Sequence, residues 1–139
     1  MTYHKIIFPA LIVVLLAASL SACSSNNANN MPMASLDQMS AEVQSAPVTV
    51  RQAYQFAVAN PDVMKHIPCY CGCESIGHTS NYSCYVNSDG SFDNHALGCS
   101  LCVDITQDAM RLTKEGKTIP QIKAYVDAAY SKYGTSNMP

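Results

Sequence analysis

Six of the seven cysteines lie between Cys69 and Cys102, and three of them occupy alternate positions. These three belong to the hexapeptide Pro-Cys-Tyr-Cys-Gly-Cys, which begins at Pro68 and ends at Cys73. Alternate residues of an extended chain point to opposite faces, so three such thiols meet only where the backbone curls around a common centre. Gly72 provides the conformational freedom for that curl, and Pro68 fixes the backbone that enters it. A thiolate metal centre or a dense set of disulfides would each explain this pattern.

Cys99 and Cys102 lie at the start of a predicted helix. Residues three apart share a helix face, so both sulfurs can reach one centre, and the helix N-terminus stabilises a thiolate. A Cys-x-x-Cys pair in this position is typical of a redox-active dithiol or of half a thiolate metal site. The redox interpretation has less support, because no βαβ pattern surrounds the pair and no strand precedes it.

The number and type of these donors favour Cu(I) as the bound metal. Soft thiolates select Cu(I), zinc or iron–sulfur clusters, and six thiols exceed one tetrahedral zinc site. No ferredoxin spacing is present. Cu(I) accepts two or three thiolates, and bridging sulfurs let several ions share the six cysteines. Cu(I) is therefore the expected metal, and zinc is the alternative. The expected ligands are Cys69, Cys71, Cys73, Cys84, Cys99 and Cys102, with His78 as an auxiliary nitrogen ligand.

Within this ligand set we expect Cys71 to be the most central sulfur, because Cys69 and Cys73 flank it at equal spacing. His66 and His95 precede cysteines by three and four residues. We expect each of them to be solvated or to cap a helix rather than to bind metal.

A second hypothesis has no metal at all. Exported proteins with an even number of cysteines usually form disulfides, and the three cysteines of the hexapeptide could pair with Cys84, Cys99 and Cys102. The chain would then be a disulfide-stabilised interaction module. A third hypothesis is a thiol-disulfide oxidoreductase that uses Cys99 and Cys102. No nucleophile–base pair or paired-carboxylate motif points to another enzyme, so we expect no enzymatic activity.

The N-terminal residues have the layout of a secretory signal. A short segment with Lys5 precedes an apolar run, and Leu20-Ser21-Ala22-Cys23 resembles the lipobox at which bacterial lipoproteins are cleaved and lipidated. The sequence therefore predicts a lipoprotein signal peptide over residues 1–22 and lipidation of Cys23. The chain would be anchored to the extracytoplasmic face of the cell membrane, with the lipid bilayer as a partner. An ordinary signal peptide, with Cys23 incidental, is the alternative.

The charge of the chain argues against a nucleic-acid partner. Eight Lys and Arg stand against ten Asp and Glu, giving a formal net charge of −2, and no basic patch is present. The length allows one domain with a modest core. Because tryptophan is absent, we expect this core to depend on cross-links or a metal. With the cysteine pattern described above, the sequence predicts a metal-binding protein for storage, detoxification or delivery of copper to a copper-handling partner.

The predicted fold class is mainly α: a small helical domain with a C-terminal helical hairpin and an irregular cysteine-rich insert. The expected organisation is a flexible tether over residues 23–47, a folded domain over 48–134 and a tail over 135–139. A weak helix near Ser35 would carry Leu36, Met39 and Val43. Helical patterns cover residues 49–60, 61–66, 99–115 and 118–134. Residues 82–86 look like a strand, followed by a turn at 87–90.

Several of these motifs together resemble those of the PCYCGC-motif lipoproteins. They are the hexapeptide at 68–73, Gly77-His78, Cys84-Tyr85, Gly90 and the Cys99-x-x-Cys102 pair. The resemblance spans about residues 48–134. It implies an exported, usually lipid-anchored protein in which the cysteines and Gly77-His78 are functional positions.

Overall fold

The computed structural model describes residues 31–138, so the predicted signal peptide and Cys23 lie outside the described part. The fold is mainly α, as the sequence predicts. Its α-helices are α2 (Ala41–Ser45), α3 (Val48–Ala59), α4 (Pro61–Met64), α5 (His95–Gly98), α6 (Ser100–Lys114) and α7 (Ile119–Tyr130). Short 3-10 turns lie at Leu36–Gln38, Cys73–Ile76, Tyr82–Cys84 and Ser131–Tyr133.

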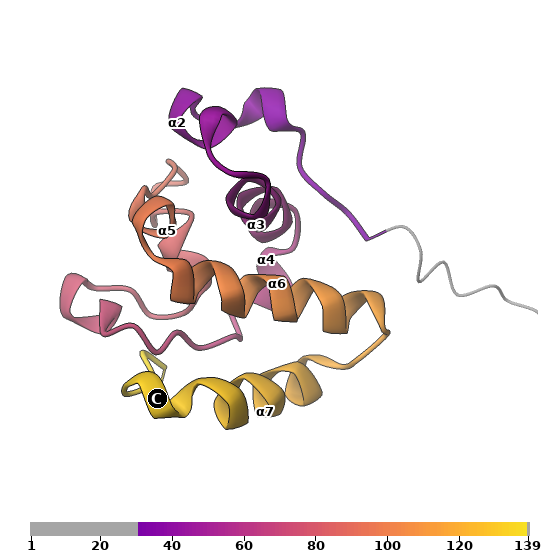
Figure 1. Cartoon of the computed structure of the whole chain (residues 1–139), viewed down its shortest axis with the longest axis vertical. Coiled ribbons are helices and arrows are strands. Elements are labelled where there is room, and N and C mark those ends of the chain that lie inside the picture. The colour runs from indigo at the N-terminus through magenta and orange to yellow at the C-terminus, as the bar shows by residue number, and fades with distance from the viewer. Residues whose placement is uncertain (1–30, 139) are drawn as a thin grey trace, which may run out of the picture.

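Helices α3 and α6 form the centre of the core. In Figure 1, α3 is seen end-on and α6 runs across it. One face of α3 is buried, formed by Ala53, Tyr54, Phe56 and Ala57. The helix ends before Pro61, because a proline disfavours helical backbone in the residue that precedes it. The buried face of α6 carries Val103, Ile105, Ala109 and Leu112 as well as Cys102, so the packing of the core also fixes one of the thiols.

The predicted helical hairpin is confirmed: α6 and α7 lie antiparallel, joined by a short connection (Figure 1). Gly116 adopts a left-handed conformation with φ of 76° after the end of α6, which a residue with a side chain rarely does. The backbone N–H of Thr118 donates to Gln121 Oε1 at 2.9 Å and starts α7. Ile122 and Val126 anchor α7 in the core. The cysteine-rich segment lies at the end of the molecule where α6 begins and α7 ends.

The structure differs from the sequence prediction in the segment before α3. Met39 and Val43 are buried in the core, and Asn60 Nδ2 donates to Pro32 O at 2.8 Å. Ala34 and Gln55 exchange two hydrogen bonds, of 3.0 and 2.8 Å. The described residues of the predicted tether are thus part of the folded domain, because their few apolar side chains find a place against α3.

The strand predicted over residues 82–86 is wrong. The chain makes a 3-10 turn at Tyr82–Cys84, and the β-pairing within residues 31–138 is one isolated bridge between Val86 and Phe92. The predicted turn between them is present, with Gly90 at φ of 85°. The turn conformation lets two consecutive side chains, Cys84 and Tyr85, both enter the interior, which alternation along a strand would prevent. In the described part of the chain, no helix has the length and apolar character needed to cross a membrane.

Candidate metal centre

The hexapeptide curls as its composition predicts. Gly72 has φ of 81°, a left-handed conformation that glycine adopts without strain, and a 3-10 turn starts at Cys73. Cys69 Sγ and Cys71 Sγ lie 3.4 Å apart. The sulfurs of Cys69, Cys71 and Cys73 all lie within 4.8 Å of one another. Three alternate thiols therefore face a common centre.

Cys102 is the sulfur at the middle of the cluster. Its Sγ lies 3.3 Å from Cys69 Sγ, 3.7 Å from Cys71 Sγ, 3.4 Å from Cys84 Sγ and 3.3 Å from Cys99 Sγ. Cys71, which we expected to be most central, has close contacts with two sulfurs and is partly exposed. The difference arises because spacing within the hexapeptide says nothing of the helix that enters the cluster from the other side.

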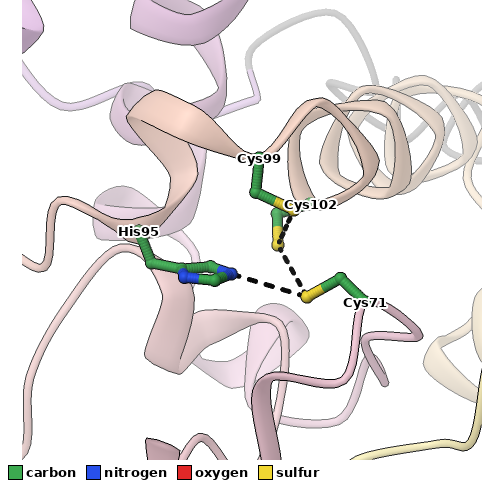
Figure 2. A group of neighbouring side chains, drawn as sticks. All are labelled: Cys71, His95, Cys99 and Cys102. Atoms are coloured by element: carbon green, nitrogen blue, oxygen red, sulfur yellow. Dashed lines mark hydrogen bonds between the residues drawn. The ribbon is translucent and has the colours of Figure 1, made fainter.

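Figure 2 shows the part of the centre nearest the solvent. Cys99 and Cys102 come from the start of α6, His95 comes from α5, and Cys71 reaches them from the hexapeptide loop. His95 Nε2 lies 3.5 Å from Cys71 Sγ. Cys71, His95 and Cys99 are each partly exposed, whereas Cys102 is buried. Three of the four donors in this group are therefore accessible to solvent.

A second group lies deeper. The sulfurs of Cys73 and Cys84 are 3.9 Å apart, and the ligand atoms of His78 and His95 lie within 4.8 Å of them and of each other. His78 is buried, and its Nε2 lies 3.4 Å from Asp93 Oδ2. Its other ring nitrogen, Nδ1, is buried without a hydrogen-bond partner. The expected auxiliary ligand thus has a free nitrogen inside the protein.

The two remaining histidines of the domain differ in their surroundings. His66 is exposed, with its Nδ1 2.7 Å from Asp62 O, in keeping with the expected solvated or capping role. His95 differs from that expectation, because it lies against Cys71 and belongs to both groups of potential ligands. A signal for it exists in the sequence: His95, Cys99 and Cys102 are spaced four and three apart, which would place them along one side of a continuous helix. In the structure the extended Cys99 separates α5 from α6, and the ligand atoms of the three residues still meet.

Buried hydrogen bonds hold the start of α6 in the cluster. The carbonyl oxygen of Cys102 lies 3.3 Å from Asn81 Nδ2, 2.9 Å from the Tyr85 hydroxyl and 3.0 Å from Thr106 Oγ1. The ring of Tyr85 packs edge-on against Tyr54, with centroids 4.9 Å apart. These contacts link α3 and the insert to the helix that supplies the central sulfur, and so fix its position.

The last described residues complete the site. Asn137 Oδ1 accepts a hydrogen bond from Cys69 N at 2.7 Å, and Asn137 Nδ2 lies 3.5 Å from Cys73 Sγ and 3.3 Å from His78 O. Asn137 is buried, although the sequence placed it in a tail outside the domain. Gly134 lies so close to the hexapeptide that a Cβ atom there would be 2.6 Å from Tyr70 O. The segment 134–137 therefore clamps the motif loop.

The crowded thiols divide between ionised and protonated forms. Hydrogen bonds from Cys102 and Cys84 lower the pKa of Cys69 well below its ordinary 9.0, and a hydrogen bond from Cys84 lowers the pKa of Cys73 to about 7. The pKa of Cys71 is raised by burial and that of Cys84 by its hydrogen bond to Cys102. A hydrogen bond to Cys69 raises the pKa of Cys102. Without a cation the cluster holds few thiolates, so metal binding must release protons.

All six cysteines between Cys69 and Cys102 are free thiols. With His78 and His95 they bring together eight soft or borderline donors that could hold metal ions. All seven expected ligands lie in these groups; His95, Asp93 and Asn137 are the participants that sequence reasoning missed.

Comparison with known proteins places these residues in a family. A family model described as "Protein of unknown function with PCYCGC motif" matches residues 12–138. No curated protein and no solved structure matches the chain. The family match covers the hexapeptide loop, all eight donors and the clamping Asn137. The chain therefore belongs to the PCYCGC-motif family.

Proposed function

We propose that this protein binds Cu(I) through its cysteine cluster at the extracytoplasmic face of the cell membrane. Its role is storage, detoxification or delivery of copper to a copper-handling partner, without enzymatic activity. Lipidated Cys23 anchors it to the bilayer. Support for the anchor comes from the lipobox-like Leu20-Ser21-Ala22-Cys23 sequence. Support for metal binding comes from the grouped Cys and His donors.

One observation carries the proposal: Cys102 Sγ lies within 3.7 Å of four other sulfurs. A disulfide joins each sulfur to one partner at about 2.05 Å, so a cysteine with four near-equivalent neighbours is not arranged for one bridge. A bridging thiolate, in contrast, contributes to more than one ion. The arrangement around Cys102 suits a polynuclear thiolate centre.

The surroundings favour Cu(I) among the soft ions. Cu(I) is stable with two or three thiolates, and the sulfurs of Cys69, Cys71 and Cys102 lie 3.3–3.7 Å from one another. Burial of Cys69 and Cys102 keeps water and oxidants from the ion. The partly exposed Cys71 and Cys99 offer a place where a partner's ligands can take over the ion.

The test is a Cu(I) titration of the reduced full chain, in detergent and without oxygen, against a competing chelator. We expect more than one Cu(I) to bind per chain. Native mass spectrometry is the second measurement. Protein from the export compartment should gain the mass of copper. A chain that is lighter by the mass of six hydrogens and binds no Cu(I) after reduction would favour the disulfide-stabilised module instead.

A thiol-disulfide oxidoreductase is the second candidate, supported by Cys99 at the N-cap of α6, partly exposed and 3.3 Å from Cys102 Sγ. In that reaction the Cys99 thiolate attacks a substrate disulfide and releases one substrate thiolate. Cys102 then displaces the second, so the substrate gains two electrons and two protons while a Cys99–Cys102 disulfide forms. Reduction of a disulfide peptide by the parent and by Cys84→Ser, but not by Cys99→Ser, would support this candidate.

A further inference from the structure

Four of the eight donors form a nitrogen-containing set: Cys73, Cys84, His78 and His95. Two thiolates and two imidazoles are a tetrahedral zinc ligand set. Zinc bonds of 2.0–2.3 Å place tetrahedral ligand atoms about 3.3–3.8 Å apart. The two sulfurs are 3.9 Å apart and all four ligand atoms lie within 4.8 Å, so a small inward shift would close the set around one ion.

His78 is the strongest sign of a ligand at this position. The residue is 8% exposed, and Nδ1 is buried without any hydrogen-bond partner. A buried polar atom without a partner destabilises the fold unless something binds it. The opposite nitrogen, Nε2, faces Asp93 Oδ2 at 3.4 Å, so a proton held there leaves the lone pair of Nδ1 free for a metal.

Asp93 supports both histidines at once. While Oδ2 faces the ring of His78, Oδ1 accepts a hydrogen bond from the backbone N–H of His95 at 2.7 Å. The two imidazole rings meet edge to face, with centroids 5.1 Å apart. A carboxylate behind a ligating histidine fixes its tautomer and orientation, as in carboxylate–histidine–zinc arrangements. The backbone carbonyl of Asp93 is itself held by the Tyr54 hydroxyl at 2.7 Å.

The other four cysteines do not need this set to form a centre. Cys69, Cys71 and Cys99 all lie within 3.7 Å of Cys102, so a sulfur-only group remains when Cys73 and Cys84 are assigned elsewhere. A thiolate-only group suits Cu(I) and can also hold Zn²⁺, whereas two thiolates with two imidazoles are a ligand set of four-coordinate Zn²⁺.

We propose that Cys73, Cys84, His78 and His95 form a separate Zn²⁺ position, with Asp93 as its positioning residue. The assignment of the neighbouring sulfur-only group to Cu(I) rests on the proposed function. A Zn²⁺ ion here ties the hexapeptide to the distant end of the insert. A surface cleft of about 760 Å³ has both His78 and Asp93 in its lining, so it reaches the proposed Zn²⁺ position from the solvent.

The test uses the full chain, reduced and freed of metal, titrated with Zn²⁺ against a chelator and separately with Co²⁺. We expect tightly bound Zn²⁺ and, with Co²⁺, the absorption spectrum of a tetrahedral site with two thiolates, which differs from that of a four-thiolate site. His78→Gln should remove the two-thiolate Co²⁺ spectrum and the Zn²⁺ affinity that goes with it. Asp93→Asn keeps an oxygen for His95 N and should weaken Zn²⁺ binding by about 10–100-fold. Both variants should keep the circular dichroism spectrum of the parent, which shows that they fold.

Cys99→Ser is the matched control, because it should lower Cu(I) stoichiometry and leave Zn²⁺ affinity unchanged. Unchanged Zn²⁺ affinity in both His78→Gln and Asp93→Asn would overturn the zinc position, as would an equal loss in Cys99→Ser. The two proposals fail separately. A parent that binds Zn²⁺ but no Cu(I) contradicts the copper function alone, and the reverse result contradicts the zinc position alone.

Discussion

Asn137 and Cys69 are joined by two hydrogen bonds: Asn137 Oδ1 accepts from Cys69 N at 2.7 Å, and Asn137 N donates to Cys69 O at 3.0 Å. The backbone of the first cysteine of the hexapeptide is thus satisfied on both sides by one residue. Since Cys69 is fully buried, no water can replace either bond.

Asn137→Ala should therefore destabilise the reduced, metal-free protein by about 1–3 kcal/mol, because it leaves Cys69 N without a partner. Urea unfolding followed by circular dichroism measures the loss. Asn94→Ala is the control, since Asn94 is exposed and its side chain makes no capping hydrogen bond. Equal midpoints for Asn137→Ala and the parent would show that the clamp has no energetic importance.

Replacing the central sulfur should cost more copper than replacing a peripheral one. Cys102→Ser removes the atom that neighbours four sulfurs, so we expect it to lose more than one equivalent of Cu(I). Cys71→Ser, with two close sulfurs, should lose less. The measurement is Cu(I) stoichiometry of the two variants beside the parent. A greater loss in Cys71→Ser would restore the sequence-based expectation that Cys71 is central.

The stability of the reduced, metal-free protein should be highest near pH 9. A thiol whose pKa is raised on folding stabilises the protein at pH values below its ordinary pKa of 9.0, and this stabilisation is lost as the pH rises further. Burial raises the pKa of Cys71, and hydrogen bonds between sulfurs raise the pKa values of Cys84 and Cys102. Cys73 acts oppositely. Because its pKa is lowered to about 7, its contribution is complete above pH 9 and is lost as the pH falls from 9 through 7. Urea unfolding at about pH 7, 9 and 10.5 checks this. A free energy of unfolding that keeps rising above pH 9 would contradict it.

Gly134 and Gly98 should respond in opposite ways to alanine. A Cβ atom at Gly134 would lie 2.6 Å from the backbone oxygen of Tyr70, so the clamp must move, at a cost of about 1–3 kcal/mol. A Cβ at Gly98 meets nothing within 4 Å, and the residue is helical. Gly98→Ala should leave stability unchanged or raise it by about 0.4–1 kcal/mol. Thermal melting of both variants measures the difference. Similar melting temperatures for the two variants would argue against the close approach of Gly134 to Tyr70 O.

The lipid anchor is a prediction that depends on one atom, the sulfur of Cys23. Cys23→Ala should leave the chain unprocessed or release it from the membrane, because no thiol remains to be acylated. Detergent partitioning of the full chain measures this, with Ser25→Ala as the control that should stay in the detergent phase. A Cys23→Ala chain that partitions and migrates like the parent would rule out lipidation.

Local patterns predicted the helices well. The apolar stripe and N-terminal Cys-x-x-Cys of α6, the Asn60-Pro61 end of α3 and the Gly116 stop each have their cause within a few residues of the chain. The convergence of the cysteines was also predictable, because thiols at alternate positions have few other uses.

Long-range partners were not predictable in the same way. Asn137 lies far along the chain from Cys69, and an asparagine close to Gly134 is, by local sequence alone, typical of a turn or a tail. Asp93 looks like one more polar residue in a loop, although it faces His78 and holds His95. The order in residues 31–47 depends on α3 offering a surface for Met39 and Val43, which no local propensity encodes.

The clamp at Asn137 also sets an order of events during folding. All six ligand cysteines precede Asn137 in the chain, so the hexapeptide cannot reach its final hydrogen-bonded form until the segment with Asn137 has joined it. Closing a contact between residues so far apart also makes it a late step of folding. Assembly of the centre thus waits for the segment that contains Asn137, and a metal ion that arrives earlier meets an open, exchangeable cluster.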